Sequence, residues 1–499
     1  MTPEEIDQAS NAELWAQLGS VEGSERAAVL LELGERAADD RDYGQATSLL
    51  EEAASVGLAS EDQRLARVAQ YRLGGALFGA QDLAASAQAY AEAAALCDGP
   101  NDGSDRAAAL WGRADALRVS GDFAGALEAA IESRAFAEAE AQPSRLAGDA
   151  CFQQARALYF LDREAEALAA CRDARNHMRA LGLTSDVAVI DDFALTVCLY
   201  LGNLDQAMDL ATSCHILAKT SSTTDDDAYA MRRLAEVHIQ RGDHDEALDM
   251  LEQARARYRE DDRTFGIARC DQLRGDVLSE LGRFEESLTV LTEARVLFDA
   301  TGDDRSALKC DMDRAILLHL LHRFDEAARQ NRLIIDTCAE ADDAMAVNWG
   351  RWALVRMADN HLAAGDFERV LEIAQTWPDP TDAPQDAEQA YLALTALRAR
   401  AYDALGRQDQ ALEAANEVLR ATSMSNLPRD AGHMFEIRAA AHSDEGGPAW
   451  EHDLTRAIAV HLAAGDVDRA TALSAHFMPG DDAEEQLKLD LVDLDPGRH

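Results

Sequence analysis

Aspartates are the side chains of this sequence whose spacing comes nearest to a cation site. The pair Asp243 and Asp245 and the run Asp225–Asp227 could hold a hard cation through carboxylate oxygens. Neither has the full spacing of a calcium-binding loop, so helix capping or solvation is the favoured interpretation. No metal ion is expected at either place.

Histidines give a second set of candidates. His238 and His361 share a position in the repeat described below, and packing in a core or groove is favoured over ligation for both. His319 and His322 lie one helical turn apart, but no third ligand can be named beside them. The histidines therefore predict no metal centre.

Motifs for catalysis are also absent from the sequence. It contains no GxxxxGK phosphate loop, no strand-led GxGxxG, no HExxH and no GxSxG. No spacing brings a nucleophile and a base together. We therefore expect a protein that is not an enzyme and that needs no cofactor.

The net charge of the chain limits the classes of partner that it is expected to bind. The 499 residues carry a formal charge of −45, from 92 acidic against 47 basic side chains. Nucleic acid is disfavoured as a partner because neutralising phosphates requires a basic surface. The acids are interpreted mainly as a solvated surface, and attraction of a basic partner stays open.

Cysteine usage and hydropathy bear on the compartment. The eight cysteines form no CxxC pair and no disulfide-scaffold spacing, and Cys270 and Cys310 hold equivalent positions of the repeat described below, as small core residues would. The acidic start has no signal-peptide pattern, and no apolar run is long enough to span a membrane. We expect a cytoplasmic protein that does not bind membranes.

The elements that must position any site are helices, because apolar residues recur at three- and four-residue steps. One five-residue pattern, such as DYGQA or DFAGA, recurs through the chain. Its last residues, here called anchors, are Ala46, Ser86, Ala126, Ala167, Ala207, Ala247, Ser287, Ala327, Val370, Ala411 and Ala470. Consecutive anchors lie about 40 residues apart, with wider gaps before Val370 and Ala470, and a regular repeat of this length predicts a stacked array.

A second position supports the repeat. Nine of the eleven residues that lie twelve positions before an anchor are glycine or alanine, among them Gly74, Ala155 and Gly275. Two antiparallel helices can bring their backbones together only where side chains are small. Each unit is therefore predicted to be a hairpin of helix A and helix B.

Turn residues fit these hairpins. Glycine before Asp or Asn, as at Gly121, predicts a left-handed end to helix A and a cap for helix B. Predicted caps for each new helix A are Ser24, Ser104, Ser144, Thr184 and Ser185.

The small residue of helix A, the Gly-x-aromatic turn and the small residue of helix B resemble the tetratricopeptide repeat family, over residues 24–477. The long period resembles the variety found in kinesin light chains and some bacterial regulators. The resemblance implies an all-α, right-handed superhelical solenoid of about eleven hairpins, with helix A lining the concave surface.

The domain organisation follows the repeat. Residues 1–22 are expected to form a helical cap and 23–377 repeats one to nine. Residues 378–386 form a proline-rich joint, 387–477 the C-terminal repeats with an irregular insertion, and 478–499 an acidic mobile tail.

The resemblance also suggests where a partner would bind. Four positions of helix A are expected to face outward, and in the hairpin anchored at Ala167 they are held by Asp149, Phe152, Arg156 and Tyr159. In the early repeats, aromatic and arginine side chains at or near these outward positions predict a contact strip. The strip consists of Tyr71, Phe78, Trp111, Arg118, Phe152, Arg156 and Tyr159. The alternative is that the rings fill gaps between long helices.

The middle repeats predict a different, polar face. Arg232, Arg269, Gln272 and Lys309 fall on it and could clamp a carboxylate or an acidic peptide. Pairing with nearby acids such as Glu236 and Asp276 is the alternative.

The function predicted is a non-enzymatic scaffold or adaptor that binds a protein or peptide in its groove. The alternative is a regulator that senses a peptide or small ligand through a change of superhelix pitch. The sequence predicts neither the partner's identity nor the oligomeric state.

Overall fold

A computed structural model describes residues 3–99, 102–140, 143–220, 224–339, 344–377, 387–421, 431–442 and 448–474. Within these residues the regular structure consists of 25 helices, and no strand occurs. The chain divides into two compact units, residues 1–257 and 258–499. Each unit is described by itself.

The first unit begins with two short helices and continues as helix hairpins, and its last helix, α14, crosses the boundary. Its helices are α1 (Pro3–Gln8), α2 (Asn11–Leu18), α3 (Gly23–Asp39), α4 (Tyr43–Ala59), α5 (Gln63–Gly79), α6 (Leu83–Ala95), α7 (Gly103–Ser120), α8 (Phe123–Glu140), α9 (Arg145–Phe160), α10 (Glu164–Ala180), α11 (Thr184–Tyr200), α12 (Leu204–Thr220), α13 (Thr224–Arg241) and α14 (His244–Glu260).

The second unit continues the same alternation. Its helices are α15 (Thr264–Glu280), α16 (Phe284–Thr301), α17 (Asp304–Leu320), α18 (Phe324–Ala339), α19 (Ala344–Ala363), α20 (Phe367–Gln375), α21 (Glu388–Ala404), α22 (Gln408–Ala421), α23 (Ala431–Ala441), α24 (Pro448–Ala463) and α25 (Val467–Ser474).

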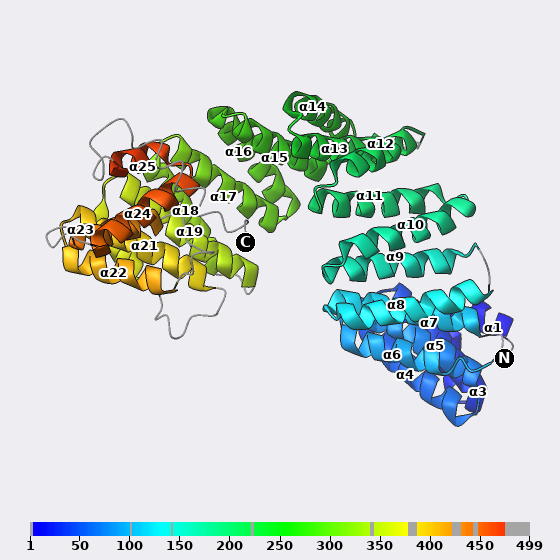
Figure 1. Ribbon diagram of the computed structural model, residues 1–499. Coiled ribbons are helices and arrows are strands. Elements are labelled where there is room, and N and C mark those ends of the chain that lie inside the picture. The colour runs from blue at the N-terminus through cyan, green and yellow to red at the C-terminus, as the bar shows by residue number, and fades with distance from the viewer. Residues whose placement is uncertain are drawn as a thin grey trace. The chain divides into compact units, whose positions relative to one another are not determined.

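Helices pack mainly on their neighbours in sequence. In the first unit α3 packs on α4 and α4 on α5, and alternate helices such as α5 and α7 also touch. Figure 1 shows α9, α10 and α11 lying side by side in this order. Contacts that join each helix hairpin mainly to its neighbouring hairpins are typical of a solenoid. The predicted all-α solenoid class is therefore confirmed.

The predicted close approach of helices A and B occurs at the small residues. The anchor hydroxyl of Ser86 donates to the carbonyl of Gly74 at 2.7 Å, and Ser287 donates to Gly275 at 2.7 Å. A Cβ atom at Gly275 would stand 2.6 Å from the side chain of Leu291, which is closer than real contacts allow. The glycine is therefore needed because the second helix lies directly against its backbone.

The turns between helices A and B follow one rule. At all eleven predicted hairpins the residue five before the anchor has a positive φ. Seven of these residues are glycine, as at Gly121, but the other four are Arg41, Gln81, Asp162 and His322. The predicted pattern of glycine before Asp or Asn found five of the glycines and missed Gly282 and Gly406, which precede arginine. It also missed these four residues, because side chains other than glycine adopt this conformation only at an energetic cost.

Caps were predicted less well. Asp122 accepts a hydrogen bond from the backbone of Gly125 at 2.9 Å, and Ser144 accepts one from Ala147 at 3.3 Å, as expected. The predictions for Ser24, Ser104, Thr184 and Ser185 were wrong. These residues lie within the first turns of α3, α7 and α11, whose N-cap residues are Glu22, Asp102 and Leu183. Each helix begins earlier than the capping residue suggested, which leaves the hydroxyls beyond the cap position.

The structure describes only some of the non-repeat segments that the sequence predicts. The proline-rich joint at 378–386 and the tail at 478–499 lie outside the described residues. The expected cap at 1–22 contains α1 and α2, and Leu14 of α2 is buried in a core cluster with Leu30 of α3. The domain boundaries drawn from the sequence stay a prediction.

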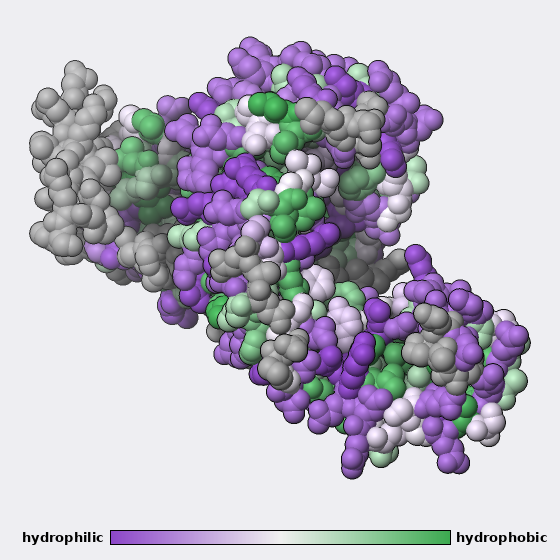
Figure 2. All heavy atoms as spheres, turned by 90° about the vertical axis from the view of Figure 1, so that its right-hand side faces the viewer, coloured by the Kyte–Doolittle hydropathy of each residue, from purple (hydrophilic) through white to green (hydrophobic). Residues whose placement is uncertain are grey.

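Core and surface differ as the composition suggests. All eight cysteines are buried and none forms a disulfide, with Cys270 and Cys310 fully enclosed, as small core residues are. Hydrophilic side chains dominate the face drawn in Figure 2, and hydrophobic ones gather there in small patches. The described helices include none with the length and apolarity that a membrane span requires.

Candidate binding site

The predicted aromatic strip lies at half-buried positions of helices A in the first unit. Tyr71 makes an edge-to-face contact with Tyr90, with ring centroids 5.5 Å apart, and packs against the core around Leu110. Phe78 and Trp111 are also half-buried.

The later part of the strip forms a network. The rings of Phe152 and Tyr159 both meet Phe193 of α11, at 5.6 and 5.7 Å. Arg118 donates to Asp115 at 2.6 Å, and the Arg156 guanidinium lies over the Phe152 ring at 5.8 Å. These contacts are internal, as the gap-filling alternative expects, and a binding role for the strip stays a prediction.

The polar face of the middle repeats is divided between the two units. In the first unit Arg232 pairs with Glu236 and lies over the Tyr229 ring at 4.9 Å. In the second unit Arg269 donates to Gln272 at 2.6 Å, and Lys309 donates to Asp313 at 2.7 Å. Each predicted contact residue thus has a polar partner on its own helix.

Burial changes the acids beside this face. Burial, followed by the nearby charge of Asp313, raises the pKa of Asp276 to about 6. Burial also raises the pKa of Asp313, although Lys309 opposes the shift. The α15–α17 face is therefore a mixed set of charges rather than a basic clamp.

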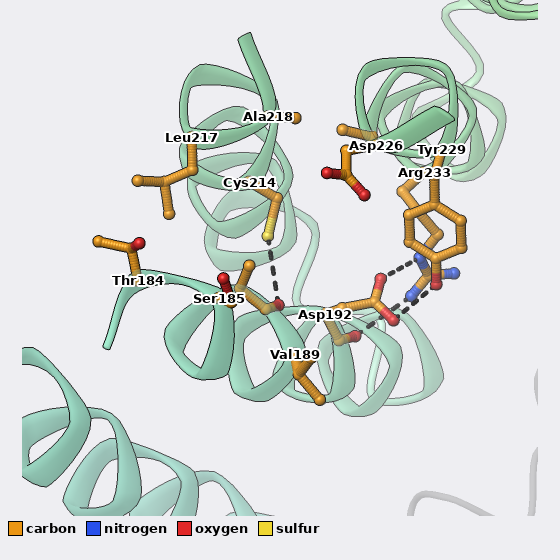
Figure 3. Close-up of a pocket in the computed structure, with 12 residues that line it drawn as sticks. Thr184, Ser185, Val189, Asp192, Cys214, Leu217, Ala218, Asp226, Tyr229 and Arg233 are labelled. Carbon is orange, nitrogen blue, oxygen red and sulfur yellow. Dashed lines mark hydrogen bonds and ion pairs between the residues drawn. The ribbon is translucent and has the colours of Figure 1, made fainter. Parts of the chain in front are cut away.

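A pocket of about 750 Å³ opens in the first unit between α11, α12 and α13 (Figure 3). It is lined by Thr184, Ser185, Ala188, Val189, Asp192, Cys214, Leu217, Ala218, Asp226, Tyr229, Ala230 and Arg233. The exposed fractions of Val189 and Tyr229 are 58% and 43%, so both present apolar surface to solvent. A hollow of this size with an apolar lining and a few polar groups suits a short segment of a partner.

One wall of the pocket is held by a hydrogen-bonded trio. Tyr229 donates its hydroxyl to Asp192 at 2.8 Å, and the Nε atom of Arg233 donates to Asp192 at 2.6 Å. Arg233 also donates to Thr196 at 2.7 Å. Figure 3 shows the trio converging from α11 and α13 at one side of the hollow. The trio fixes the distance between two helices A and so keeps the pocket open.

Electrostatics agree with this structural role. Burial and the neighbouring Asp192 raise the pKa of Tyr229 to about 12, so the phenol stays a hydrogen-bond donor. Burial alone would lower the pKa of Arg233, but Glu236 and Asp192 outweigh it and raise the pKa. Burial also raises the pKa of the Cys214 thiol to about 12, which leaves it without nucleophilic character at neutral pH. The pocket is built for binding rather than for covalent chemistry.

The sequence held a signal for this pocket. Val189 and Tyr229 occupy the outward position that Asp149 holds in its own hairpin, and Asp192 occupies the one that Phe152 holds. These positions were expected to face outward. The predicted contact residues were aromatic, arginine and other polar side chains at equivalent positions of adjacent repeats, and they did not include Val189, Asp192 or Tyr229. The positional rule located the face, and only the fold showed the hollow.

One cluster of possible metal ligands lies near the α8–α10 junction and is already satisfied. The ligand atoms of Glu138, Cys151 and His177 lie within 4.8 Å of one another. The backbone N–H of Ser144 donates to His177 Nδ1 at 3.3 Å, which leaves the proton on Nε2, facing Glu138. Burial raises the pKa of Cys151 to about 12. A protonated thiol and a protonated ring nitrogen make this a structural group.

The family model of the tetratricopeptide repeat matches residues 194–260, which span α12, α13, α14 and part of α11. This segment of the chain is therefore similar to the tetratricopeptide repeat. The matched segment includes the Tyr229 side of the pocket. The α11 residues that line the pocket, from Thr184 to Asp192, precede the matched segment.

Solved structures with the same kind of fold share little sequence. The apo form of the quorum sensor NprR from B. thuringiensis is 14% identical, with a TM-score of 0.46, and the match covers 70% of this chain and 97% of that one. A Rap protein complexed with competence and sporulation factor is 12% identical, with a TM-score of 0.41 and coverage of 76% and 99%. A tetratricopeptide repeat protein from Parabacteroides merdae is 14% identical, with a TM-score of 0.40 and coverage of 57% and 98%. Similarities this weak carry no argument about function, and no curated protein matches the chain.

Proposed function

We propose that this protein is a non-enzymatic, cytoplasmic scaffold that binds a peptide segment of a partner protein in the α11–α13 pocket. The observation that carries the proposal is the hollow itself. Its lining exposes Val189 and Tyr229, while its polar wall is already fixed by internal hydrogen bonds. Apolar side chains exposed in a concave site are the usual anchors of a bound peptide.

Charge defines the peptide further. Asp192 and Asp226 border the pocket, and the whole chain carries a charge of −45. An acidic surface raises the local concentration of positively charged partners and speeds their association. The proposed ligand is a short segment with one apolar side chain for the hollow and basic residues beside it.

The test compares two exposed apolar residues of similar accessibility. Val189 lies in the pocket with 58% of its surface exposed, whereas Ile216 lies on α12 outside the lining with 59% exposed. Peptides are selected from a random displayed library on the full chain, and their affinities are measured by titration calorimetry. Val189→Arg is expected to weaken binding by about 30-fold or more, which corresponds to a hot spot of about 2 kcal/mol.

The control is Ile216→Arg, which adds the same charge beside the same helices and should leave affinity unchanged. Circular dichroism checks that both variants keep their helicity. Selection of no saturable peptide would contradict the proposal. Equal losses in the two variants would show that charge rather than the pocket is responsible.

The alternative function, a ligand-sensing regulator, uses the same pocket and adds a change of superhelix pitch. Small-angle scattering of the full chain with and without a selected peptide distinguishes the two functions. A scaffold gives identical profiles, whereas a regulator gives a change in the radius of gyration.

A further inference from the structure

The C-terminal helices place two histidines and a glutamate around one point. His433 and Glu436 lie three residues apart on α23 and so share a helix face, and His461 faces them from α24. One ligand atom from each lies within 4.8 Å of the others. His461 Nε2 is 2.7 Å from Glu436 Oε1, and the rings of His433 and His461 meet edge to face at 4.9 Å.

The group is enclosed on one side and open on the other. His461 is 2% exposed, and a Cβ atom at Gly432 would stand 2.7 Å from its Nε2, so the space around that nitrogen depends on glycine. A pocket of about 220 Å³ is lined by His433, Glu436 and Arg469, among others. It leaves room for a water molecule or a ligand atom as a fourth partner.

Neighbouring charges orient the group. Asp466 Oδ2 lies 3.6 Å from His461 Nδ1, on the side away from Glu436. Arg469 of α25 binds Glu436, and Asp403 and Arg400 line the same pocket. A carboxylate behind a ligating imidazole and a partner for a ligating carboxylate are typical outer groups of metal sites.

A comparison of equivalent histidines in three repeats shows what is particular to the group of His433, Glu436 and His461. His238, His361 and His461 share one position relative to their anchors, and each pairs with an aspartate in the turn that follows, with Nδ1 to Oδ2 distances of 3.3, 3.5 and 3.6 Å. The histidine–aspartate pair is therefore part of the repeat. Among the described residues, only the third copy gathers a second histidine and a glutamate.

We propose that His433, Glu436 and His461 bind one Zn²⁺ ion, with the fourth position open to the adjoining pocket. Two imidazole nitrogens and one carboxylate oxygen are a zinc donor set, and three protein ligands with one open position are usual for accessible zinc. Ligand atoms on tetrahedral zinc stand about 3.3 Å apart, as metal–ligand distances of about 2.0–2.1 Å require. His461 Nε2 and Glu436 Oε1 need to separate by only about 0.6 Å from their present 2.7 Å.

The test uses the full untagged chain, stripped with a chelator and kept reduced, and titrated with Zn²⁺ by calorimetry. One stoichiometric site is expected, and it should be weakened more than about 100-fold in His433→Gln, since even outer-shell partners of a metal contribute about 10- to 100-fold. His433 is half-buried, so this change is milder for folding than a change at buried His461.

Two control variants should keep full affinity. His238→Gln alters the same repeat position in the first unit, and His177→Gln alters the satisfied Glu138–Cys151–His177 group. If His433→Gln loses helicity, Glu436→Gln takes its place with the same readout. Co²⁺ substitution adds visible absorption bands of a low-symmetry, four-coordinate ion, and these bands should vanish in the His433 variant.

Three results would overturn the proposal. They are the absence of a saturable one-to-one site, an unchanged affinity in both His433→Gln and Glu436→Gln, and an equal loss in His177→Gln. A one-to-one site that only the His433 and Glu436 variants lose establishes it.

Discussion

The α11–α13 pocket and the α15–α17 face occupy matching positions of the repeat but have opposite characters. The outward position held by Asp149 in its own hairpin is held by Val189 and Tyr229 in the pocket, and by Arg269 and Lys309 on the charged face. Val189 and Tyr229 leave a hollow with exposed apolar surface. Arg269 and Lys309 instead turn to polar partners on their own helices.

This difference indicates that the repeat places the same positions on the surface each time, and that the side chains at these positions determine whether a hollow remains between the helices. Long charged side chains find partners three or four residues away on the same helix, which covers the surface they come from. Val189 has no polar group with which to do this, and the ring of Tyr229 stays 43% exposed although its hydroxyl is bound, so a hollow between the helices remains. Binding capacity in this chain therefore follows from missing internal partners more than from the presence of charge.

The largest expected effect comes from breaking the trio at the pocket wall. Asp192→Ala leaves Arg233, which is 9% exposed, without one of its acidic partners. Because Glu236 still pairs with Arg233 and Asp192 is only partly buried, losing the hydrogen bonds to Asp192 should cost about 2–3 kcal/mol. Urea denaturation followed by circular dichroism should show a loss of this size, and the pKa of Tyr229 should fall from about 12 toward its usual value near 10.

A double variant sharpens this result. Asp192→Ala combined with Arg233→Met removes the guanidinium that has lost one of its two acidic partners, and should recover part of the lost stability. Failure to recover it would mean that the trio acts through packing rather than through charge.

The second effect concerns the α15–α17 face, where a substitution is expected to raise the stability of the protein rather than lower it. The pKa of Asp276 is raised to about 6, so the folded state binds its proton more tightly than the unfolded state does. The stability from this residue is present below pH 4 and is lost as the pH rises through 6. Asp276→Asn should therefore stabilise the protein at pH 8, by about 1–3 kcal/mol.

The check is a set of melting curves between pH 4 and pH 8. The advantage of Asp276→Asn over the wild type should grow across this range and level off above pH 7. An advantage that does not change with pH would show that Asp276 is ionised throughout.

A smaller effect is expected when only the phenol of the pocket is removed. Tyr229→Phe loses the 2.8 Å hydrogen bond to Asp192 but keeps the ring. Stability should fall by about 1 kcal/mol. Peptide affinity, measured by calorimetry, should stay within about threefold of the wild type if burial of the ring carries binding. A large loss of affinity would move the recognition from the ring to the hydroxyl.

The smallest effect is expected at Lys309, the more exposed partner of an ion pair on the α15–α17 face. Lys309 is 46% exposed on its side chain and pairs with Asp313 one turn away. Lys309→Ala should cost about 0.5 kcal/mol in urea denaturation, since Lys309 itself is exposed although Asp313 is not. Loss of selected-peptide affinity in this variant would contradict the contrast between the two regions and place the ligand on the charged face.

Sequence reasoning succeeded where one local constraint repeats. Gly74 and Gly275 recur because a second helix lies on their backbone, and the anchor hydroxyls of Ser86 and Ser287 reach their carbonyls. It failed at Arg41 and His322, which hold left-handed turns without glycine. There the packing of the two helices fixes the turn, and the side chain bears the strain.

The candidate sites were less predictable than the fold. The positional rule placed Val189, Asp192 and Tyr229 on the correct face, but a hollow depends on which side chains from three helices fail to fill it. Likewise, the sequence position of His461 relative to its anchor is the same as that of His238 and His361, so it does not mark His461 as a ligand. The folded structure does so, because α23 brings His433 and Glu436 beside it.

The sequence by itself determined the helical class, the regular long repeat and the small residues at which helices A and B meet, because each depends on residues close in the chain. Only the tertiary structure decided which outward positions are paired and which remain open. That outcome depends on distances between side chains in neighbouring repeats, such as Asp192 and Arg233, and no local pattern encodes them.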